Sequence, residues 1–376
     1  MRPKIIHLDN STAVTGAYNA LLSWCRAEPE FDHVWVLPEG SAVIPQLRPH
    51  FKVYTLPFVE IGKSPAKLIR YLPALWKNGN SLRKIVQKEQ PQVVHVNDLY
   101  NLVPYVSRLL FKMRLPIVVH ARMLRRSFPA PIYDFWKRLH LRMADAIIAV
   151  SAAVKKDWDN DARILVIYDH INVTESLTPY VFDKAAGSPF RFLYLANYIR
   201  GKGQEDALEA VRLLREKGVT DFGVDFYGGT MGLEKNEAFK AELQALSQQY
   251  QLGDLIHFHG PSDNIEALMK GYHALLHFSH AESFGMVCYE ALYYGLPVIS
   301  SDCGGPAEMM KPGVSGMLLP VSDAPAFSAA MQQLIESPEK CRSLSQNAVA
   351  FIDNGFVQHS SNLHKVISSL ITRSNN

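Results

Sequence analysis

The sequence predicts an α/β fold made of two consecutive domains, each a doubly wound parallel sheet. Three observations support this prediction. The 376 residues suffice for two domains that each bury a core. Continuous apolar runs recur along the chain, each followed by a stretch of helical period, which is typical of parallel strands covered on both faces. The pattern is interrupted by the polar stretch DKAAGSPF (183–190) and then restarts.

The strand-like runs fall into two series. The first comprises KIIHL (4–8), HVWVLP (33–38), FKVYTLP (51–57), VVHVN (93–97), PIVVHA (116–121), AIIAVS (146–151) and ILVIYD (164–169). The second comprises RFLYLAN (191–197), DFGVDFYGG (221–229), LIHFHG (255–260), ALLHFS (274–279), PVISS (297–301) and GMLLP (316–320). We therefore place the domains at 1–185 and 186–355, followed by a C-terminal helix (356–376) that we expect to pack back on the first domain. Ligands of such sheets bind at the carboxyl ends of the strands, so the cleft between the domains is the expected site.

Composition excludes several classes of protein. With 48% hydrophobic and 20% charged residues the chain is neither fibrous nor disordered. No apolar stretch reaches the roughly 18 residues that span a bilayer, and the N-terminus turns polar too early for a signal peptide. The four cysteines are scattered without a CxxC pair, so the sequence indicates neither a zinc site nor a disulfide framework. We expect reduced cysteines and a cytoplasmic protein.

Charge is distributed unevenly. Residues 1–184 hold 25 Lys and Arg against 16 Asp and Glu, whereas the remainder of the chain is net acidic. Residues 108–142 carry nine basic side chains and one acid. Such a face suits an anionic membrane, a phosphorylated substrate or nucleic acid, although no nucleic-acid recognition motif accompanies it. A merely solvated basic surface is the alternative.

Two glutamates, Glu282 and Glu290, stand in an otherwise apolar run. A carboxylate buried there needs partners, because an unpaired buried charge costs several kcal/mol. The run reads as a strand (ALLHFS), a loop (HAES) and a helix (FGMVCYEALYYG) that ends at Gly295. The free backbone N–H groups at the start of this helix would bind an anion; they belong to Phe284, Gly285, Met286 and Val287.

The two carboxylates would lie about 12 Å apart along the helix, at 1.5 Å per residue. Gly285 leaves room for a phosphate between them. Such a site suits a long ligand that has hydroxyls at both ends and an anion between them. A nucleotide sugar is such a ligand, with its ribose diol, pyrophosphate and sugar hydroxyls. The alternative is an ordinary helix-start glutamate followed by a solvated one.

Residues 282–319 resemble the donor-site signature of retaining glycosyltransferases of family 4, the glycosyl transferases group 1. The matching residues are Glu282, Glu290, Gly295, Pro297, Val298, Gly304, Gly305 and Glu308. The resemblance implies the GT-B fold, in which two Rossmann-like domains face each other across a cleft, with acceptor on the first and donor on the second. It also implies a hexosyltransferase that moves a sugar from a UDP-sugar or GDP-mannose, with retention, to a glycan or lipid-linked acceptor in cell-surface polysaccharide or lipopolysaccharide assembly.

The resemblance assigns further site residues. Lys202, followed by Gly203, matches the family's pyrophosphate-binding lysine. Asn197 stands where the family usually has an arginine, and Arg200 is the candidate replacement. Gly16 opens the first strand-to-helix loop, and His120 ends a strand where many members carry a histidine near the reacting sugar. A structural histidine is the alternative for His120.

The expected chemistry needs no cofactor. Charge that develops on the leaving phosphate would be stabilised by Lys202, by Arg200 and by the helix amides, and no Asp-x-Asp metal motif is present. We therefore expect no metal. Similarity to the family assigns sugar hydroxyls to Glu282 and the ribose diol to Glu290, neither acting as a nucleophile, with His120 orienting the donor sugar or the acceptor.

Two other functions remain open at this stage. A sugar-nucleotide 2-epimerase shares the architecture but needs acid and base residues that the sequence does not reveal. A non-catalytic scaffold is the other, although intact Glu282, Glu290 and Lys202 argue against it.

For the acceptor, Arg122, Arg125 and Arg126 are expected at the rim of the cleft. Basic residues around Phe135 and Trp136 favour peripheral binding to the cytoplasmic face of an anionic membrane, with a soluble acceptor as the alternative.

Overall fold

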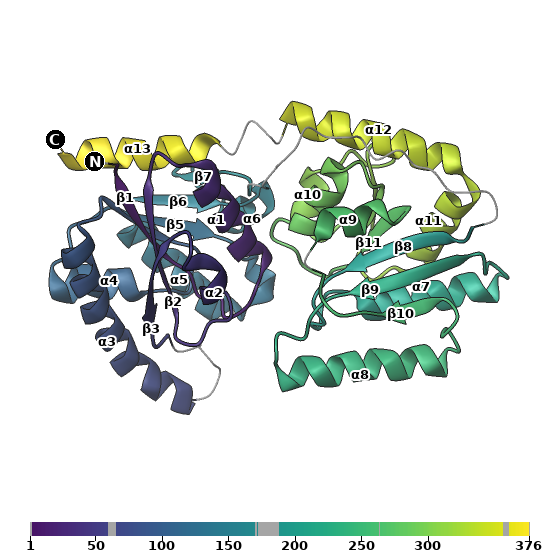
Figure 1. Cartoon of the computed structure of the whole chain (residues 1–376), viewed down its shortest axis with the longest axis horizontal. Helices are drawn as coiled ribbons and strands as arrows, with labels where there is room; N and C mark the ends of the chain where they lie inside the picture. Colours follow the sequence, from purple (N-terminus) through teal and green to yellow (C-terminus); the bar gives the residue numbers. More distant parts are fainter. Residues whose placement is uncertain are drawn as a thin grey trace. The chain divides into compact units, whose positions relative to one another are not determined.

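The chain folds into two units, Met1–Asn172 with His359–Asn376, and Val173–Gln358 (Figure 1). The computed structural model describes residues 2–58, 65–169, 171, 188–262, 264–355 and 361–375. The predicted boundary between residues 185 and 186 lies outside the described residues. Each unit contains one parallel sheet flanked by helices, so the predicted pair of Rossmann-like domains is confirmed.

The sheet of unit 1 has seven parallel strands in the order β3-β2-β1-β4-β5-β6-β7. The strands are β1 (Lys4–Leu8), β2 (Asp32–Pro38), β3 (Lys52–Leu56), β4 (Val93–Val96), β5 (Ile117–Ala121), β6 (Ala146–Ala149) and β7 (Ile164–Val166). Its helical elements are α1 (Gly16–Ala27), α2 (Ile44–Leu47), α3 (Pro65–Glu89), α4 (Val103–Phe111), η1 (Arg125–Ser127), α5 (Ala130–Met143), α6 (Ala152–Asp157) and α13 (Ser361–Asn375).

The sheet of unit 2 has six parallel strands in the order β10-β9-β8-β11-β12-β13. The strands are β8 (Phe190–Leu195), β9 (Phe222–Tyr227), β10 (Ile256–Phe258), β11 (Ala274–His277), β12 (Val298–Ser301) and β13 (Met317–Leu319). Its helical elements are α7 (Gln204–Glu216), α8 (Glu234–Gln249), α9 (Ile265–Lys270), α10 (Met286–Tyr293), η2 (Gly305–Glu308), α11 (Ala324–Glu336) and α12 (Pro338–Gly355). In both sheets the strand order reverses direction beside the first strand, which is where doubly wound folds bind ligands.

The C-terminal helix α13 belongs to the core of unit 1. Its apolar side chains Leu363, Ile367 and Leu370 are buried in one cluster with β1, β2 and α1. His364 adds a polar contact, with Nδ1 2.8 Å from the Glu28 carboxylate. This helix therefore completes unit 1 although unit 2 precedes it in the sequence. Among the described residues, every helix is too short or too polar to cross a membrane.

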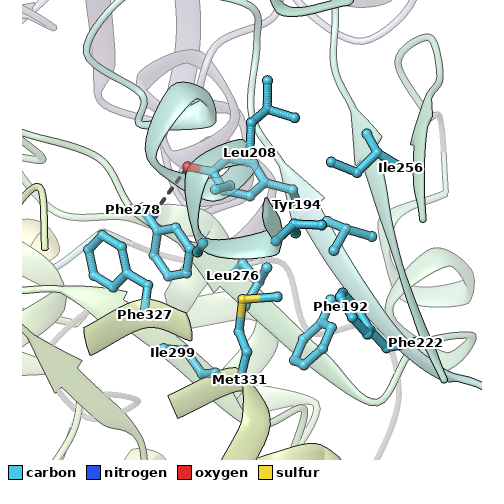
Figure 2. Packing of buried hydrophobic residues seen from close by; sticks show 14 of the residues in the cluster. Phe192, Tyr194, Leu208, Phe222, Ile256, Leu276, Phe278, Ile299, Phe327 and Met331 are labelled. Atoms are coloured by element: carbon cyan, nitrogen blue, oxygen red, sulfur yellow. Dashed lines mark hydrogen bonds between the residues drawn. The ribbon is translucent and has the colours of Figure 1, made fainter. Parts of the chain in front are cut away.

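The core of unit 2 fixes the loops that follow its strands. Phe278 and Phe327 stack with ring centroids 3.8 Å apart, and Tyr194 lies beside them (Figure 2). The buried Tyr194 hydroxyl accepts from the Phe278 N–H at 3.2 Å and donates to the Lys202 carbonyl at 2.6 Å. A buried hydroxyl needs such partners, so this tyrosine ties the loop after β8 to the end of β11.

Candidate active site

A salt bridge between Lys202 and Glu282 joins two predicted site residues that lie 80 positions apart. Lys202 Nζ lies 2.6 Å from Glu282 Oε2, and the side chains are 30% and 20% exposed. Burial opposes both charges. Each charge nevertheless stabilises the other, so the pKa of Lys202 is held above its usual value and that of Glu282 below it. The structure therefore presents a fixed cation with a carboxylate beside it.

Backbone hydrogen bonds and close packing fix the two loops that carry this pair. Glu282 forms a bridge with the next loop: its N–H donates to the Cys303 carbonyl, and its carbonyl accepts from Gly305, both at 2.9 Å. Gly203 caps α7 with φ +75°, and a Cβ there would lie 2.0 Å from the Phe278 carbonyl oxygen. The glycine after Lys202 is thus required because the chain just after β11 passes so close.

His277, which the sequence analysis did not single out, lies against the same carboxylate. Its Nε2 is 3.7 Å from Glu282 Oε2 and has no hydrogen-bond partner among the described residues. The side chain is 4% exposed, and burial lowers its pKa to about 4, so the ring is neutral. The feature of the sequence that could have indicated His277 is its position at the carboxyl end of the predicted strand ALLHFS.

Helix α10 carries the other predicted donor-site residues. The prediction began this helix at Phe284, but it begins at Met286, because Gly285 adopts φ +94° and forms the N-cap. A Cβ on Gly285 would lie 2.8 Å from Pro306, so only glycine fits. The Phe284 side chain is buried against Tyr289, and the amides of Met286 and Val287 form the first helical turn.

Glu290 remains without an ionic partner. No described residue forms a salt bridge or hydrogen bond with its carboxylate, and burial raises its pKa to about 7. This differs from Glu282, whose partner is Lys202. Ionisation of this half-buried carboxyl is therefore unfavourable in the protein alone. A ligand whose hydroxyls donate hydrogen bonds to the carboxylate would relieve that cost.

Arg200 and Asn197 do not join Lys202. The Arg200 guanidinium is 63% exposed, pairs with Glu242 and covers the Phe239 ring at 4.7 Å on α8. Asn197 Oδ1 accepts from the Gly229 N–H at 3.0 Å and so connects the loops after β8 and β9. In this structure Asn197 has a structural contact, and Arg200 lies on the surface.

In unit 1, Gly16 is exposed at the first turn of α1, after the Thr15 N-cap. His120 is only 3% exposed, with Nδ1 3.3 Å from His95 Nε2. Arg122, expected at a cleft rim, is instead buried, because Asp169 accepts two hydrogen bonds from its Nη1. Trp136, which the sequence analysis grouped with Phe135 in a segment suited to an interface, is buried and does not contribute to an exposed face, whereas Phe135 is exposed.

A pocket of about 320 Å³ lies at the carboxyl edge of the unit 1 sheet. Its lining comes from the end of β2, from the segments that follow β1, β3, β4 and β5, and from helices α3 and α5, and it includes Asn10, Asp98, Tyr100, Asn101, Phe128 and Trp136. Burial raises the pKa of the Asp98 carboxyl to about 7, although the Leu99 N–H donates to it at 2.7 Å. His120 is not part of the lining. Asp98 was missed by the sequence analysis, although the polar NDLYN directly follows a buried strand.

Two family profiles match the chain. The profile described as Glycosyl transferases group 1 matches residues 182–351, and the profile Glycosyltransferase Family 4 matches residues 29–175. Together they cover most of both units. The chain belongs to the group 1 glycosyltransferases. It is therefore a glycosyltransferase, and Lys202, Glu282 and Glu290 all lie within the part that matches the first profile.

Curated relatives of this glycosyltransferase are themselves transferases or synthases of sugar conjugates. It is 26% identical over 311 residues to the lipopolysaccharide 1,6-galactosyltransferase of Escherichia coli (strain K12), covering 79% of this chain and 80% of the relative. It is 23% identical over 311 residues to the N-acetyl-alpha-D-glucosaminyl L-malate synthase of Bacillus anthracis, covering 79% of each protein.

Solved structures confirm the GT-B fold of this glycosyltransferase. Anabaena Alr3699/HepE in complex with UDP and glucose matches with a TM-score of 0.80 at 20% identity, covering 98% of this chain and 100% of that one. The sucrose-phosphate synthase of Thermosynechococcus elongatus matches with a TM-score of 0.82 at 20% identity, covering 99% and 100%. At these identities the likeness shows the fold alone.

Proposed function

We propose that this glycosyltransferase transfers a hexose from a nucleoside diphosphate sugar, with retention of configuration, to a glycan or lipid-linked acceptor in cell-surface polysaccharide assembly. One observation carries the proposal: the Lys202–Glu282 pair stands before α10, and on α10 lies Glu290, with which no described residue pairs. A diphosphate would accept from Lys202 and from the amides of Met286 and Val287. The ribose diol would donate to Glu290, and the transferred sugar would donate to Glu282.

The leaving group determines where the protein must supply positive charge. As the bond to the anomeric carbon breaks, negative charge grows on the terminal phosphate, and Lys202 is positioned to stabilise it without a divalent metal. The neutral His277 ring supports this arrangement, since it leaves Glu282 free to be shared between Lys202 and sugar hydroxyls. Attack from the same face, assisted by the departing phosphate, accounts for retention without an enzyme nucleophile.

The donor is the first property to test. The structure of Alr3699/HepE contains UDP and glucose, and the Escherichia coli relative is a galactosyltransferase, which favours a UDP-hexose. In a thermal-shift panel of UDP-, GDP- and ADP-sugars, one class should raise the melting temperature. A ligand at 100 times its Kd adds about 2.7 kcal/mol to the stability of the folded protein. If no nucleotide sugar shifts the transition, the proposal fails.

The pocket of unit 1 is the proposed acceptor site, with Asp98 accepting a hydrogen bond from the attacking hydroxyl. Replacement Asp98→Asn should raise the KM for acceptor and lower kcat/KM by roughly 10–100-fold, since a hydrogen bond to a charged group contributes about 1.5–3 kcal/mol. The KM for donor should not change. Because the Asp98 carboxyl titrates near neutrality, wild-type kcat/KM should fall below about pH 7 and the variant should lack that limb. An unchanged pH profile in the variant would remove Asp98 from the acceptor site.

The basic surface around α5 is the proposed contact with the cytoplasmic face of a membrane. Phe135 is 55% exposed there. Much of the charge is already paired, because Arg125 contacts Asp134 at 2.9 Å and Lys137 contacts Asp159 at 2.6 Å. Binding to anionic vesicles should therefore be weak and lost at high salt, at about 1 kcal/mol for each unpaired basic residue. Co-sedimentation with anionic and neutral vesicles tests this, and equal partitioning to both would favour a soluble acceptor instead.

A further inference from the structure

Four histidines form a buried row across neighbouring strands of the unit 1 sheet. His33 on β2, His7 on β1, His95 on β4 and His120 on β5 are all buried. Their ring nitrogens are in contact along the whole row. His33 Nδ1 lies 2.9 Å from His7 Nε2, His7 Nδ1 lies 3.0 Å from His95 Nδ1, and His95 Nε2 lies 3.3 Å from His120 Nδ1.

The two ends of this row fix where the protons must be. His33 Nε2 lies 3.1 Å from the carbonyl oxygen of Glu28, which can only accept, so that nitrogen carries the hydrogen and Nδ1 carries a lone pair. At the other end, Nη2 of Arg122 lies 3.4 Å from His120 Nδ1. A guanidinium can only donate, so this nitrogen also carries a lone pair. Arg122 is itself held in place by Asp169.

These two ends are incompatible with a fully hydrogen-bonded row of neutral rings. A neutral imidazole has one N–H. From the Arg122 end, His95 must donate to His120 through Nε2, and His7 must donate to His95 through Nδ1. The Nε2 of His7 then has a lone pair that faces the lone pair of His33 Nδ1 at 2.9 Å. This contact of the row lacks a hydrogen: the Cys25 thiol can donate only a weak hydrogen bond to His7 Nε2, whereas a cation would use both lone pairs.

A third ligand stands at this contact. Cys25 Sγ on α1 lies 3.7 Å from His7 Nε2, and the donor atoms of Cys25, His7 and His33 are all within 4.8 Å of one another. We propose that these three side chains bind a Zn²⁺ ion. One thiolate and two imidazoles form a ligand set that suits zinc, and the sequence spacing concealed it because the ligands come from β1, α1 and β2.

The distances from His7 to the other two ligands are close to those that zinc requires. With Zn–N near 2.05 Å and Zn–S near 2.3 Å, tetrahedral ligands stand about 3.3 Å (N to N) and about 3.5 Å (S to N) apart. The two histidine nitrogens must therefore separate by roughly 0.4 Å, and the sulfur already lies close to the required distance from His7. Outer partners are also in place. The Glu28 carbonyl accepts from His33, and His95 accepts from His7, as histidine ligands of metals usually require.

The three ligands are buried, but a surface pocket reaches two of them. Cys25 and His33 both line a surface pocket of about 490 Å³, which gives a route for the ion and space for a water as fourth ligand. Burial raises the pKa of the Cys25 thiol, so without metal it holds its proton. Binding therefore replaces S–H by S–Zn and releases one proton to solvent. The ion would clamp β1, α1 and β2 together, and it is independent of the proposed transfer chemistry.

Cobalt substitution in the 376-residue chain tests the proposal. Protein freed of metal with a chelator and titrated with Co²⁺ should bind one equivalent, with a thiolate-to-cobalt charge-transfer band and tetrahedral d–d bands, and Zn²⁺ should abolish both. X-ray absorption of the zinc-loaded wild type should show one sulfur and two nitrogen neighbours from imidazole, a result that needs no variant. The melting temperature should rise with added Zn²⁺.

Matched variants locate the site. Cys25→Ser should lose the charge-transfer band, whereas Cys341→Ser, which alters another buried cysteine in unit 2, should keep it. The proposal is overturned if wild-type protein binds no Co²⁺ or Zn²⁺, if the bound ion has only oxygen and nitrogen neighbours, or if Cys25→Ser keeps the band. Absence of metal binding would mean that a proton, rather than zinc, occupies the contact between His7 and His33.

Discussion

Replacing Lys202 with methionine is expected to lower the rate of sugar transfer by roughly 10²–10³-fold, the usual cost of removing one preorganised donor from a developing anion. Methionine keeps most of the length and apolar volume of the stem but removes the charge that lies 2.6 Å from Glu282. The loss should appear in kcat, because the phosphate gains charge only as the glycosidic bond breaks. Steady-state kinetics at saturating nucleotide sugar would measure it, with circular dichroism to verify folding.

Arg200→Met is the matched control, since it removes a cation two positions earlier in the same loop. Arg200 is 63% exposed and pairs with Glu242 on α8, an interaction of a kind that contributes about 0–1 kcal/mol. Its loss should change kcat by less than about fivefold. Equal losses in both variants would mean that Arg200 turns toward the phosphates when donor binds. If chelation abolished transfer and Mg²⁺ restored it, a divalent metal rather than Lys202 would stabilise the charge on the leaving phosphate.

The sheets could be predicted because each buried parallel strand is a continuous apolar run. All the predicted runs, from KIIHL to GMLLP, contain strands in the structure. Strand order could not be read from them, because an apolar run does not reveal which neighbour it pairs with. Helix boundaries depend on single residues, and α10 begins at Met286 rather than Phe284 because Gly285 adopts a left-handed conformation.

Site residues were predictable where their charges conflict with their surroundings. Glu282 and Glu290 stand out in an apolar run, and the structure gives one of them a cation while no described residue pairs with the other. Arg200 was chosen for its proximity in sequence to Lys202, but the sequence does not reveal that α8 offers Glu242 and Phe239 to it. Asp98 has an ordinary sequence context, and only the folded pocket raises its pKa.

Glu290→Gln should stabilise the donor-free protein at alkaline pH. Burial raises the pKa of this carboxyl from 4.5 to about 7. Well below pH 4.5 it is protonated in both the folded and unfolded states and carries no penalty. Above about pH 7 it is ionised in both, and the folded state bears a cost of about 3 kcal/mol. The free energy of unfolding of the wild type therefore falls as pH rises through this window. The advantage of the glutamine variant should grow by about 2.5 kcal/mol between about pH 5 and pH 8, measured by urea unfolding of the whole chain.

The same substitution should weaken donor binding, so its two effects have opposite signs. The ionised carboxylate accepts stronger hydrogen bonds from the ribose diol than an amide does, and its loss should cost about 1.5–3 kcal/mol, roughly 10–100-fold in Kd at about pH 8. Calorimetric titration with the nucleotide sugar measures this. Glu266→Gln is the control, because Glu266 is a carboxylate at the surface of α9 that already pairs with Lys270, and it should alter neither quantity. An ordinary structural glutamate at position 290 would give a more stable variant with unchanged donor affinity. Only a carboxylate kept unpaired for a ligand gives both a gain in stability and a loss in binding.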